Sequence, residues 1–292
     1  METNSTSPLD LPNSTEEGNL IKPLSLGGGF WVAIQFLLIQ ILVFIVVGVI
    51  GLGINGGVDM NGVEDEQALN NFLMSFGLPL AFLAGAWYLY KKRGLISTAF
   101  AWKSNFIKLI PLGLLMMYGV TYILGEIMTY MPGYEAMLEM YQSMFAGINP
   151  TALLIGGALI GPICEEIIFR GIILEGLAQK YNPTKAIIFS ALIFGIIHLQ
   201  PLQVISAFFI GLILGWIYLK TQSLWVVIAL HVINNTIAFT FADLGTESTR
   251  ASIGNDLFYL GTFALAGIIA YLAYLGFKKV EPTEPVSVSV YA

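Results

Sequence analysis

Six polar or ionisable residues stand inside apolar stretches of this sequence, where such side chains are rare. They are Glu165, Glu166, Arg170, His198, His231 and Asn235, and they include both histidines of the chain. An ionisable group in the hydrocarbon of a membrane is costly unless it is paired or solvated, which makes it a functional candidate by default. These six residues therefore form the candidate functional site.

The spacing of these residues predicts which of them share a helix face. Glu166 and Arg170 are four residues apart, so they lie on one face and can form an ion pair. His231 and Asn235 share a face for the same reason. Glu165 lies about 100° around the helix from Glu166. We therefore expect one carboxylate to face a cavity and the other to be held by Arg170.

A carboxylate, two imidazoles and an amide in a low-dielectric cavity are suited to hydrolysis. The carboxylate can act as a general base that activates water. An imidazole and an asparagine amide can donate hydrogen bonds to the oxyanion of a tetrahedral intermediate. A second imidazole can carry a proton to the leaving amine. This set of groups meets the needs of peptide-bond hydrolysis.

The elements that position these residues follow from composition and from long apolar runs. The chain of 292 residues is 56% hydrophobic and 11% charged, whereas a soluble domain carries about 25% charged residues. A helix needs about 20 apolar residues to cross a bilayer. The sequence predicts an all-α polytopic membrane protein with about eight transmembrane helices, at Phe30–Ile54, Ala68–Tyr90, Phe106–Met128, Pro150–Leu174, Thr184–Leu199, Leu202–Leu219, Leu224–Phe241 and Leu257–Phe277.

These segments divide the chain into five parts. Residues 1–29 lack the pattern of a signal peptide and are rich in Ser, Asn, Pro and Glu, so we expect a disordered cytoplasmic tail. N-terminal transmembrane helices occupy residues 30–149, and the candidate site falls in a catalytic core of residues 150–241. Residues 242–280 hold the last transmembrane helix, and residues 281–292 form a second tail.

Basic residues between the predicted spans indicate the orientation of the chain. Lysine and arginine concentrate in alternate connections, while the other connections are acidic or neutral apart from Arg250. Because cytoplasmic loops carry the excess of basic residues, we expect both termini in the cytoplasm, and the lack of targeting signals favours a bacterial cell membrane. The net charge of −6 argues against a nucleic-acid partner. The expected partners are the lipid bilayer and a membrane-associated peptide or protein substrate.

The depths of two candidate residues in the membrane can be compared. Glu165 and His198 lie at nearly equal distances along the chain from Asn182, where the chain is expected to turn. A rise of about 1.5 Å per residue places both residues about 25 Å from the tip of that hairpin. The two side chains can therefore face each other at one depth if both helices run continuously to a tip that protrudes into the cytosol.

The candidate residues fall in three ordered motifs, Glu165-Glu166-Ile-Ile-Phe-Arg170, Phe194-Gly-Ile-Ile-His198 and His231-Val-Ile-Asn-Asn235. These resemble the EExxxR, FxxxH and HxxxN motifs of the CAAX-protease and bacteriocin-processing family (CPBP, or Abi). The resemblance covers about residues 150–241. It implies an intramembrane endopeptidase of eight helices, similar to the CAAX prenyl endopeptidases, with a cavity that opens towards the cytosol.

By motif position, the resemblance also implies a role for each residue. Glu165 is the expected catalytic base, and His198 is expected to assist it in activating water. His231 and Asn235 are expected to form the oxyanion site, and no cofactor is expected. Two further residues are expected to support this geometry, namely Glu166 and Arg170.

Three alternatives remain open. Glu165, His198 and His231 could bind zinc in a metallopeptidase, which is a legitimate ligand set although the sequence has no His-Glu-x-x-His pair. Cys164 could act as a nucleophile beside a histidine, although a lone buried cysteine is more often a small hydrophobe. The cluster could instead be structural, in a non-catalytic bacteriocin-immunity, regulatory or transport protein. The substrate is equally open between a prenylated peptide, a leader peptide and another membrane peptide.

Overall fold

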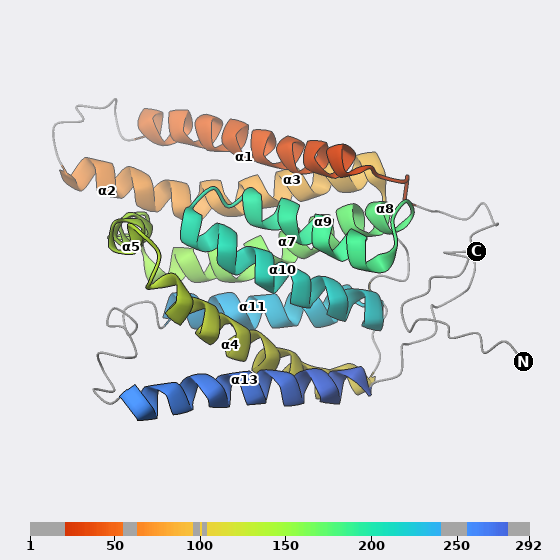
Figure 1. The fold of residues 1–292 in the computed structure, drawn as a ribbon. Coiled ribbons are helices and arrows are strands. Elements are labelled where there is room, and N and C mark those ends of the chain that lie inside the picture. Colours follow the sequence, from red (N-terminus) through yellow and green to blue (C-terminus); the bar gives the residue numbers. More distant parts are fainter. Residues whose placement is uncertain (1–20, 55–62, 96–99, 101–103, 241–255, 280–292) are drawn as a thin grey trace, which may run out of the picture.

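The computed structural model describes residues 21–54, 63–95, 100, 104–240 and 256–279. Within these residues every regular element is a helix, and the long helices run side by side in one bundle (Figure 1). The elements are α1 (Leu26–Ile54), α2 (Val63–Phe72), η1 (Leu73–Gly77), α3 (Leu78–Arg93), η3 (Ser104–Lys108), α4 (Leu109–Met128), α5 (Tyr134–Ser143), α6 (Pro150–Ala152), η4 (Leu153–Ile160), α7 (Gly161–Ile168), η5 (Phe169–Leu174), α8 (Glu175–Ala178), α9 (Pro183–Ile196), α10 (Pro201–Thr221), α11 (Leu224–Thr240) and α13 (Asp256–Lys278).

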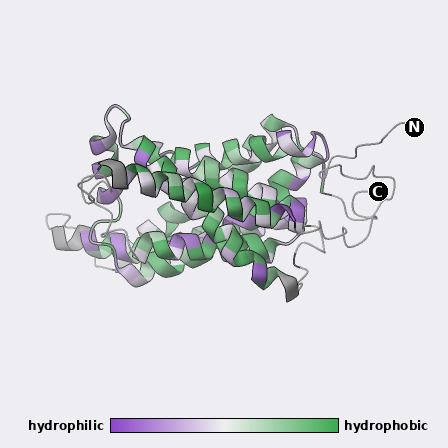
Figure 2. Ribbon diagram, turned by 60° about the horizontal axis from the view of Figure 1, so that its bottom comes forward, coloured by the Kyte–Doolittle hydropathy of each residue, from purple (hydrophilic) through white to green (hydrophobic). Residues whose placement is uncertain are grey.

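The prediction of an all-α polytopic membrane protein is confirmed. Six helical stretches in the described part of the chain are long and apolar enough to cross a membrane, and two shorter apolar helices, α9 and α11, occupy the fifth and seventh predicted spans. The 14 residues of α9 extend about 21 Å, which is less than the bilayer core of about 30 Å. Hydrophobic residues cover most of the bundle, and hydrophilic residues gather mainly at its two ends (Figure 2).

The predicted N-terminal tail, residues 1–29, is too long at its C-terminal side. Helix α1 begins at Leu26, and the side chains of Ile21 and Leu24 are buried. The Leu24 N–H also donates a hydrogen bond of 2.7 Å to the carbonyl oxygen of Gly176. The chain is therefore anchored before the first predicted span. Residues 1–20, most of the segment before α13, and the second tail, residues 281–292, lie outside the described residues.

The fourth predicted span is one continuous helical stretch, Pro150–Ala178. Asn149 caps its start by accepting a hydrogen bond of 2.8 Å from the Thr151 N–H, and Pro150 occupies the first turn, where its missing N–H does not matter. Two π-helical segments, η4 and η5, flank α7 directly. Such segments are frequent at functional sites because they shift the register of the side chains that follow.

Helices α9 and α10 form a tight hairpin. Gly195 permits the close approach, because a Cβ atom there would lie 2.8 Å from the carbonyl oxygen of Val204. Gln200 caps α10 by accepting a hydrogen bond of 2.8 Å from the Gln203 N–H, and Pro201 opens the helix as expected. His198 lies in the short connection between the two helices.

Helix α5 was not predicted. It follows Gly133, whose positive φ of 76° suits glycine, and it lies at the end of the bundle where α4 ends and α10 begins (Figure 1). The sequence signal was present, because Tyr134, Met137, Leu138 and Tyr141 follow the spacing of an amphipathic helix. The helix is too short and too polar to register as a span.

Candidate active site

Glu166 is the centre of a buried ion-pair network. The fully buried Glu166 Oε1 lies 2.7 Å from Arg170 Nη1 and also 2.7 Å from His231 Nδ1. Arg170 is buried as well, and its Nη2 donates a longer bond of 3.4 Å to the carbonyl oxygen of Gly211. The predicted ion pair between Glu166 and Arg170 is therefore present, and it extends to a histidine on α11.

Glu165 approaches the same histidine from the other side of its ring. Its Oε2 lies 3.7 Å from His231 Nε2, and its side chain is 12% exposed, whereas Glu166 is fully buried. The two neighbouring carboxylates thus occupy different environments, as their angular separation predicted. One is held by Arg170 and the other is partly open.

The imidazole of His231 is flanked by a carboxylate at each ring nitrogen. An ionised carboxylate can only accept hydrogen bonds, so the short contact to Glu166 places a proton on Nδ1 of His231. In the neutral ring, Nε2 is then an acceptor. The separation of 3.7 Å between Nε2 and Glu165 Oε2 exceeds a direct hydrogen bond, and two acceptors at that distance can share one water molecule.

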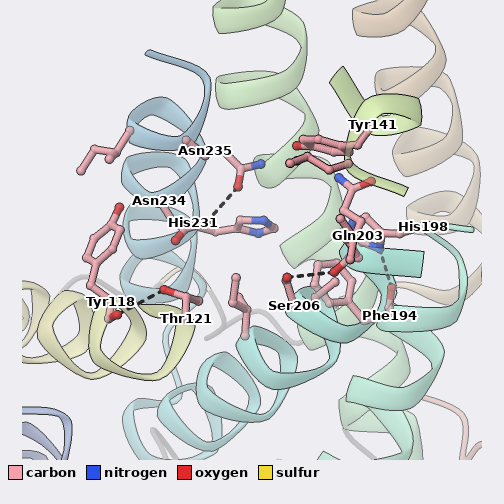
Figure 3. A pocket seen from close by; sticks show the side chains of 16 residues that line it. Tyr118, Thr121, Tyr141, Phe194, His198, Gln203, Ser206, His231, Asn234 and Asn235 are labelled. Carbon is pink, nitrogen blue, oxygen red and sulfur yellow. Dashed lines mark hydrogen bonds between the residues drawn. The ribbon is translucent and has the colours of Figure 1, made fainter. Parts of the chain in front are cut away.

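His198 faces the pocket from a different wall. Its Nδ1 lies 2.7 Å from the carbonyl oxygen of Phe194, which only accepts, so this nitrogen carries the proton. Figure 3 shows His198 and His231 entering the pocket from opposite sides. In the described part of the chain, the partner of Glu165 is His231. The imidazole in contact with Glu165 is thus that of His231, whereas His198 contacts the carbonyl oxygen of Phe194.

Phe194 holds both imidazoles in place. Its buried ring packs edge-on against His198 and His231, with centroids 4.9 Å and 5.8 Å away. The guanidinium carbon of Arg170 lies 4.7 Å from the centroid of the same ring, a cation–π contact. One aromatic side chain therefore joins the three motifs. The sequence placed Phe194 in a motif but gave no reason for the aromatic residue.

Asn235 is oriented by two hydrogen bonds. Its Nδ2 donates to the carbonyl oxygen of Gly157 over 3.3 Å, and its Oδ1 accepts from Asn234 Nδ2 over 3.2 Å. Because an amide nitrogen carries two protons, one N–H of Asn235 remains to serve the pocket. Asn235 lies one helical turn beyond His231, on the shared face that the spacing predicted.

These residues line a cavity of about 370 Å³ (Figure 3). Its walls come from α4, α5, the α9–α10 hairpin and α11. Sequence reasoning missed the polar lining residues contributed by the first three of these, which are Tyr118, Thr121, Tyr141, Gln203 and Ser206. No single one is unusual in its own helix, so their common location had no sequence signal. Burial raises the pKa of the Tyr141 hydroxyl, which therefore stays protonated and can donate a hydrogen bond at neutral pH.

Cys164 faces a different cavity. It is buried beside a second cavity of about 500 Å³, whose lining includes Trp87, Leu95 and Ile167 but neither histidine. This separation speaks against a cysteine nucleophile. Among the described residues, no group of three or more His, Cys, Asp or Glu side chains lies close enough together to hold a metal ion.

Comparisons with known proteins agree with the motifs. Residues 147–237 match the family model described as Type II CAAX prenyl endopeptidase Rce1-like, a range that includes all six candidate residues. The chain is also 35% identical over 115 residues to the protein of Bacillus subtilis (strain 168) named "Putative membrane peptidase YdiL". That alignment covers 39% of this chain and 47% of the relative, so the chain spans about half the length of the curated relative it matches. No solved structure matches. The family resemblance inferred from the motifs is confirmed for this segment.

Proposed function

We propose that this protein is an intramembrane endopeptidase that hydrolyses a peptide bond of a membrane-associated peptide with a water molecule activated by Glu165. The observation that carries the proposal is the flanked imidazole of His231, with Glu166 Oε1 at 2.7 Å from one ring nitrogen and Glu165 Oε2 at 3.7 Å from the other. The family match and the relative's name support a peptidase.

The nucleophile is a water molecule shared by Glu165 and His231. Both Glu165 Oε2 and the unprotonated Nε2 of His231 accept hydrogen bonds, so the water can direct one O–H to each and keep a lone pair for the substrate. Glu165 takes a proton as the water oxygen attacks the carbonyl carbon. The Glu166–Arg170 pair holds the His231 ring in the tautomer that this arrangement needs.

The remaining groups serve the oxyanion and the leaving amine. The free N–H of Asn235 donates to the oxyanion of the tetrahedral intermediate. When the C–N bond breaks, Glu165 returns the proton taken from water to the leaving amine, and the unprotonated Nε2 of His198, on the opposite wall, accepts a hydrogen bond from that amine. This assignment moves His198 from water activation to the leaving group, because His231 is the imidazole next to Glu165.

The proposed reaction uses the side chains of this chain and needs no metal ion. The proposed substrate is a membrane-associated peptide, and a leader peptide and a prenylated peptide are both candidates. The match to a bacterial relative supports placement in a bacterial cell membrane.

The test is the nearly isosteric variant Glu165→Gln. It should lower the rate of peptide cleavage about 10²–10⁴-fold, the usual contribution of a general base, while expression and thermal stability in detergent stay close to wild type. Glu135→Gln, which makes the same change on the exposed surface of α5, is the matched control. The readout is mass spectrometry of membrane peptides from cells that carry either variant.

Two outcomes would contradict the proposal. Wild-type peptide profiles in Glu165→Gln cells would remove the base from the mechanism. Loss of folding in Glu165→Gln, with no peptide that depends on the wild-type protein, would instead favour a structural polar network in a non-catalytic membrane protein.

A further inference from the structure

Burial along α11 changes at His231. The residues before His231 are packed into the bundle, and Leu224, Val226, Val227, Ile228 and Leu230 are all buried. The residues after it open into the cavity, whose lining includes Asn234, Asn235, Ile237 and Ala238. The site is therefore closed on the side where α11 begins, and the cavity extends towards the side where α11 ends.

The burial of side chains also changes along α10 and along the helical stretch that ends in η5 and α8. In α10, Gln203 and Ser206 of the first two turns line the cavity, whereas the last five residues, Ile217–Thr221, are buried. Every residue of η5 is buried, as are the first three residues of α8. Buried side chains thus separate the site from the end of the bundle where α8 and α10 end and α11 begins.

On its other side the cavity reaches α5. Leu138 and Tyr141 of this helix line the cavity, and Gln200, two residues after His198, donates a hydrogen bond of 3.1 Å to the Met137 carbonyl oxygen. Figure 1 shows α5 at the end of the bundle opposite to α8. We name these two ends the α5 end, marked by Leu138 and Tyr141, and the lysine end, marked by Lys180 and Lys220.

The two ends carry opposite charges. Among the residues whose side chains the structure describes, every lysine or arginine except the buried Arg170 belongs to, or directly adjoins, a helix terminus that lies at the lysine end in Figure 1. These residues are Lys22, Lys91, Lys92, Arg93, Lys108, Lys180, Lys185, Lys220, Lys278 and Lys279. Among the same described side chains, the charged residues at the α5 end are Glu126, Glu135 and Glu139. An excess of lysine and arginine marks the cytoplasmic side of a membrane protein.

We infer that the active site opens away from the cytoplasm, so that its substrate is a peptide or protein segment presented from the outer side of the membrane. The family resemblance implied a cavity open to the cytosol, and that expectation cannot hold for this cavity together with cytoplasmic lysine-rich connections. The charge distribution belongs to this chain, whereas cytosolic access came from the resemblance alone. That this segment is a substrate rests on the proposed function, whereas the side of the membrane on which the cavity opens is a property of the fold.

This inference narrows the substrate class. A peptide that reaches the cavity from the α5 end is one that has already been exported or that spans the membrane. A protein that carries its modified C-terminus on the cytoplasmic surface would meet the packed lysine end instead.

The sidedness can be measured by thiol labelling, because Cys164 is the single cysteine of the chain. In a Cys164→Ser background, Ser206→Cys places a near-isosteric thiol in the cavity wall. Lys185→Cys reports on the lysine end and Met144→Cys on the α5 end, and both positions are exposed. Intact cells are treated with a charged, membrane-impermeant thiol reagent, and the thiols that remain are counted with a permeant maleimide after solubilisation.

We expect Ser206→Cys and Met144→Cys to react in intact cells and Lys185→Cys to react only in inverted vesicles. Reaction of Lys185→Cys in intact cells would overturn the orientation. Reaction of Ser206→Cys only from the inverted side, or from neither side, would overturn the outer opening. Labelling does not require catalysis, so outer labelling of a protein that cleaves nothing would refute the proposed function and leave this inference standing.

Discussion

The side-chain amide of Gln200 donates a hydrogen bond of 3.1 Å to the carbonyl oxygen of Met137 and ties α5 to the turn that carries His198. The same side chain caps α10 through the Gln203 N–H. One buried residue thus contacts both α10, which contributes to the cavity wall, and α5 beside the cavity.

The two hydrogen bonds of the Gln200 side chain, to Met137 and to Gln203, can be separated by substitution. Gln200→Asn keeps a good N-cap but is one methylene too short to reach Met137, whereas Gln200→Ala loses both bonds. We expect the asparagine variant to speed hydrogen exchange in α5 and to raise KM, at a cost of about 1 kcal/mol for the lost bond. The alanine variant should lower the thermal stability further. Unchanged exchange in α5 of Gln200→Asn would show that the bond does not restrain this helix.

The buried ion pair predicts unequal effects of its two partners on stability. Arg170→Met leaves the Glu166 charge without its cation, which should cost about 3–5 kcal/mol of stability. Adding Glu166→Gln to Arg170→Met should restore much of that loss but not the activity, because His231 loses the carboxylate that fixes its tautomer. Thermal unfolding in detergent, measured beside peptide cleavage, tests this cycle. Additive losses would contradict the coupling.

Phe194 should affect turnover more than substrate binding. Phe194→Leu removes the edge-on contacts to both imidazoles, each worth about 0.5–1.5 kcal/mol, and lets the rings leave their productive positions. We expect kcat to fall while KM stays near the wild-type value. Phe189→Leu is the matched control, because Phe189 lies on the same helix but packs against Tyr181. Equal effects of the two variants would assign Phe194 to general packing.

Metal removal should leave the proposed reaction intact. A water molecule activated by Glu165 needs no Lewis acid, so purified protein dialysed against a strong zinc chelator should retain its rate of peptide cleavage. Metal analysis of the same sample controls for incomplete removal. Loss of activity that zinc restores would revive the metallopeptidase hypothesis, with Glu165, His198 and His231 as ligands.

Cys164 should be dispensable for the reaction. It faces the second cavity rather than the one with the histidines, so Cys164→Ala should cleave peptides at a rate close to wild type. Inactivation of this variant, combined with an active Glu165→Gln variant, would transfer the nucleophile to the cysteine.

The sequence predicted the parts of this site that lie within one helix. The pair Glu166–Arg170 and the shared face of His231 and Asn235 depend only on helical periodicity, and both are present. The eight apolar segments also lie where their hydropathy indicated. Helical periodicity and the length of an apolar segment are local properties of the chain, so both can be recognised from the sequence alone.

The contacts between helices could not be read in this way. The pairing of Glu165 with His231 rather than His198 depends on how α7 and α11 cross, and the π segments around α7 shift its side chains away from regular periodicity. The role of Phe194 depends on three helices at once. Helix α5 was missed because a short amphipathic helix is hidden beside long apolar spans.

The position of Arg170 on the same helix as Glu166 has a consequence for biogenesis. When this stretch leaves the insertion machinery, the buried carboxylate of Glu166 already has its cation one turn away, so these two side chains enter the bilayer as a neutral pair. Glu165 has no basic residue four positions away on its own helix. Its contact, His231, is synthesised later in the chain. Under the proposed function, the site that activates water is therefore completed only when α11 has been inserted, so an incomplete nascent chain would be inactive.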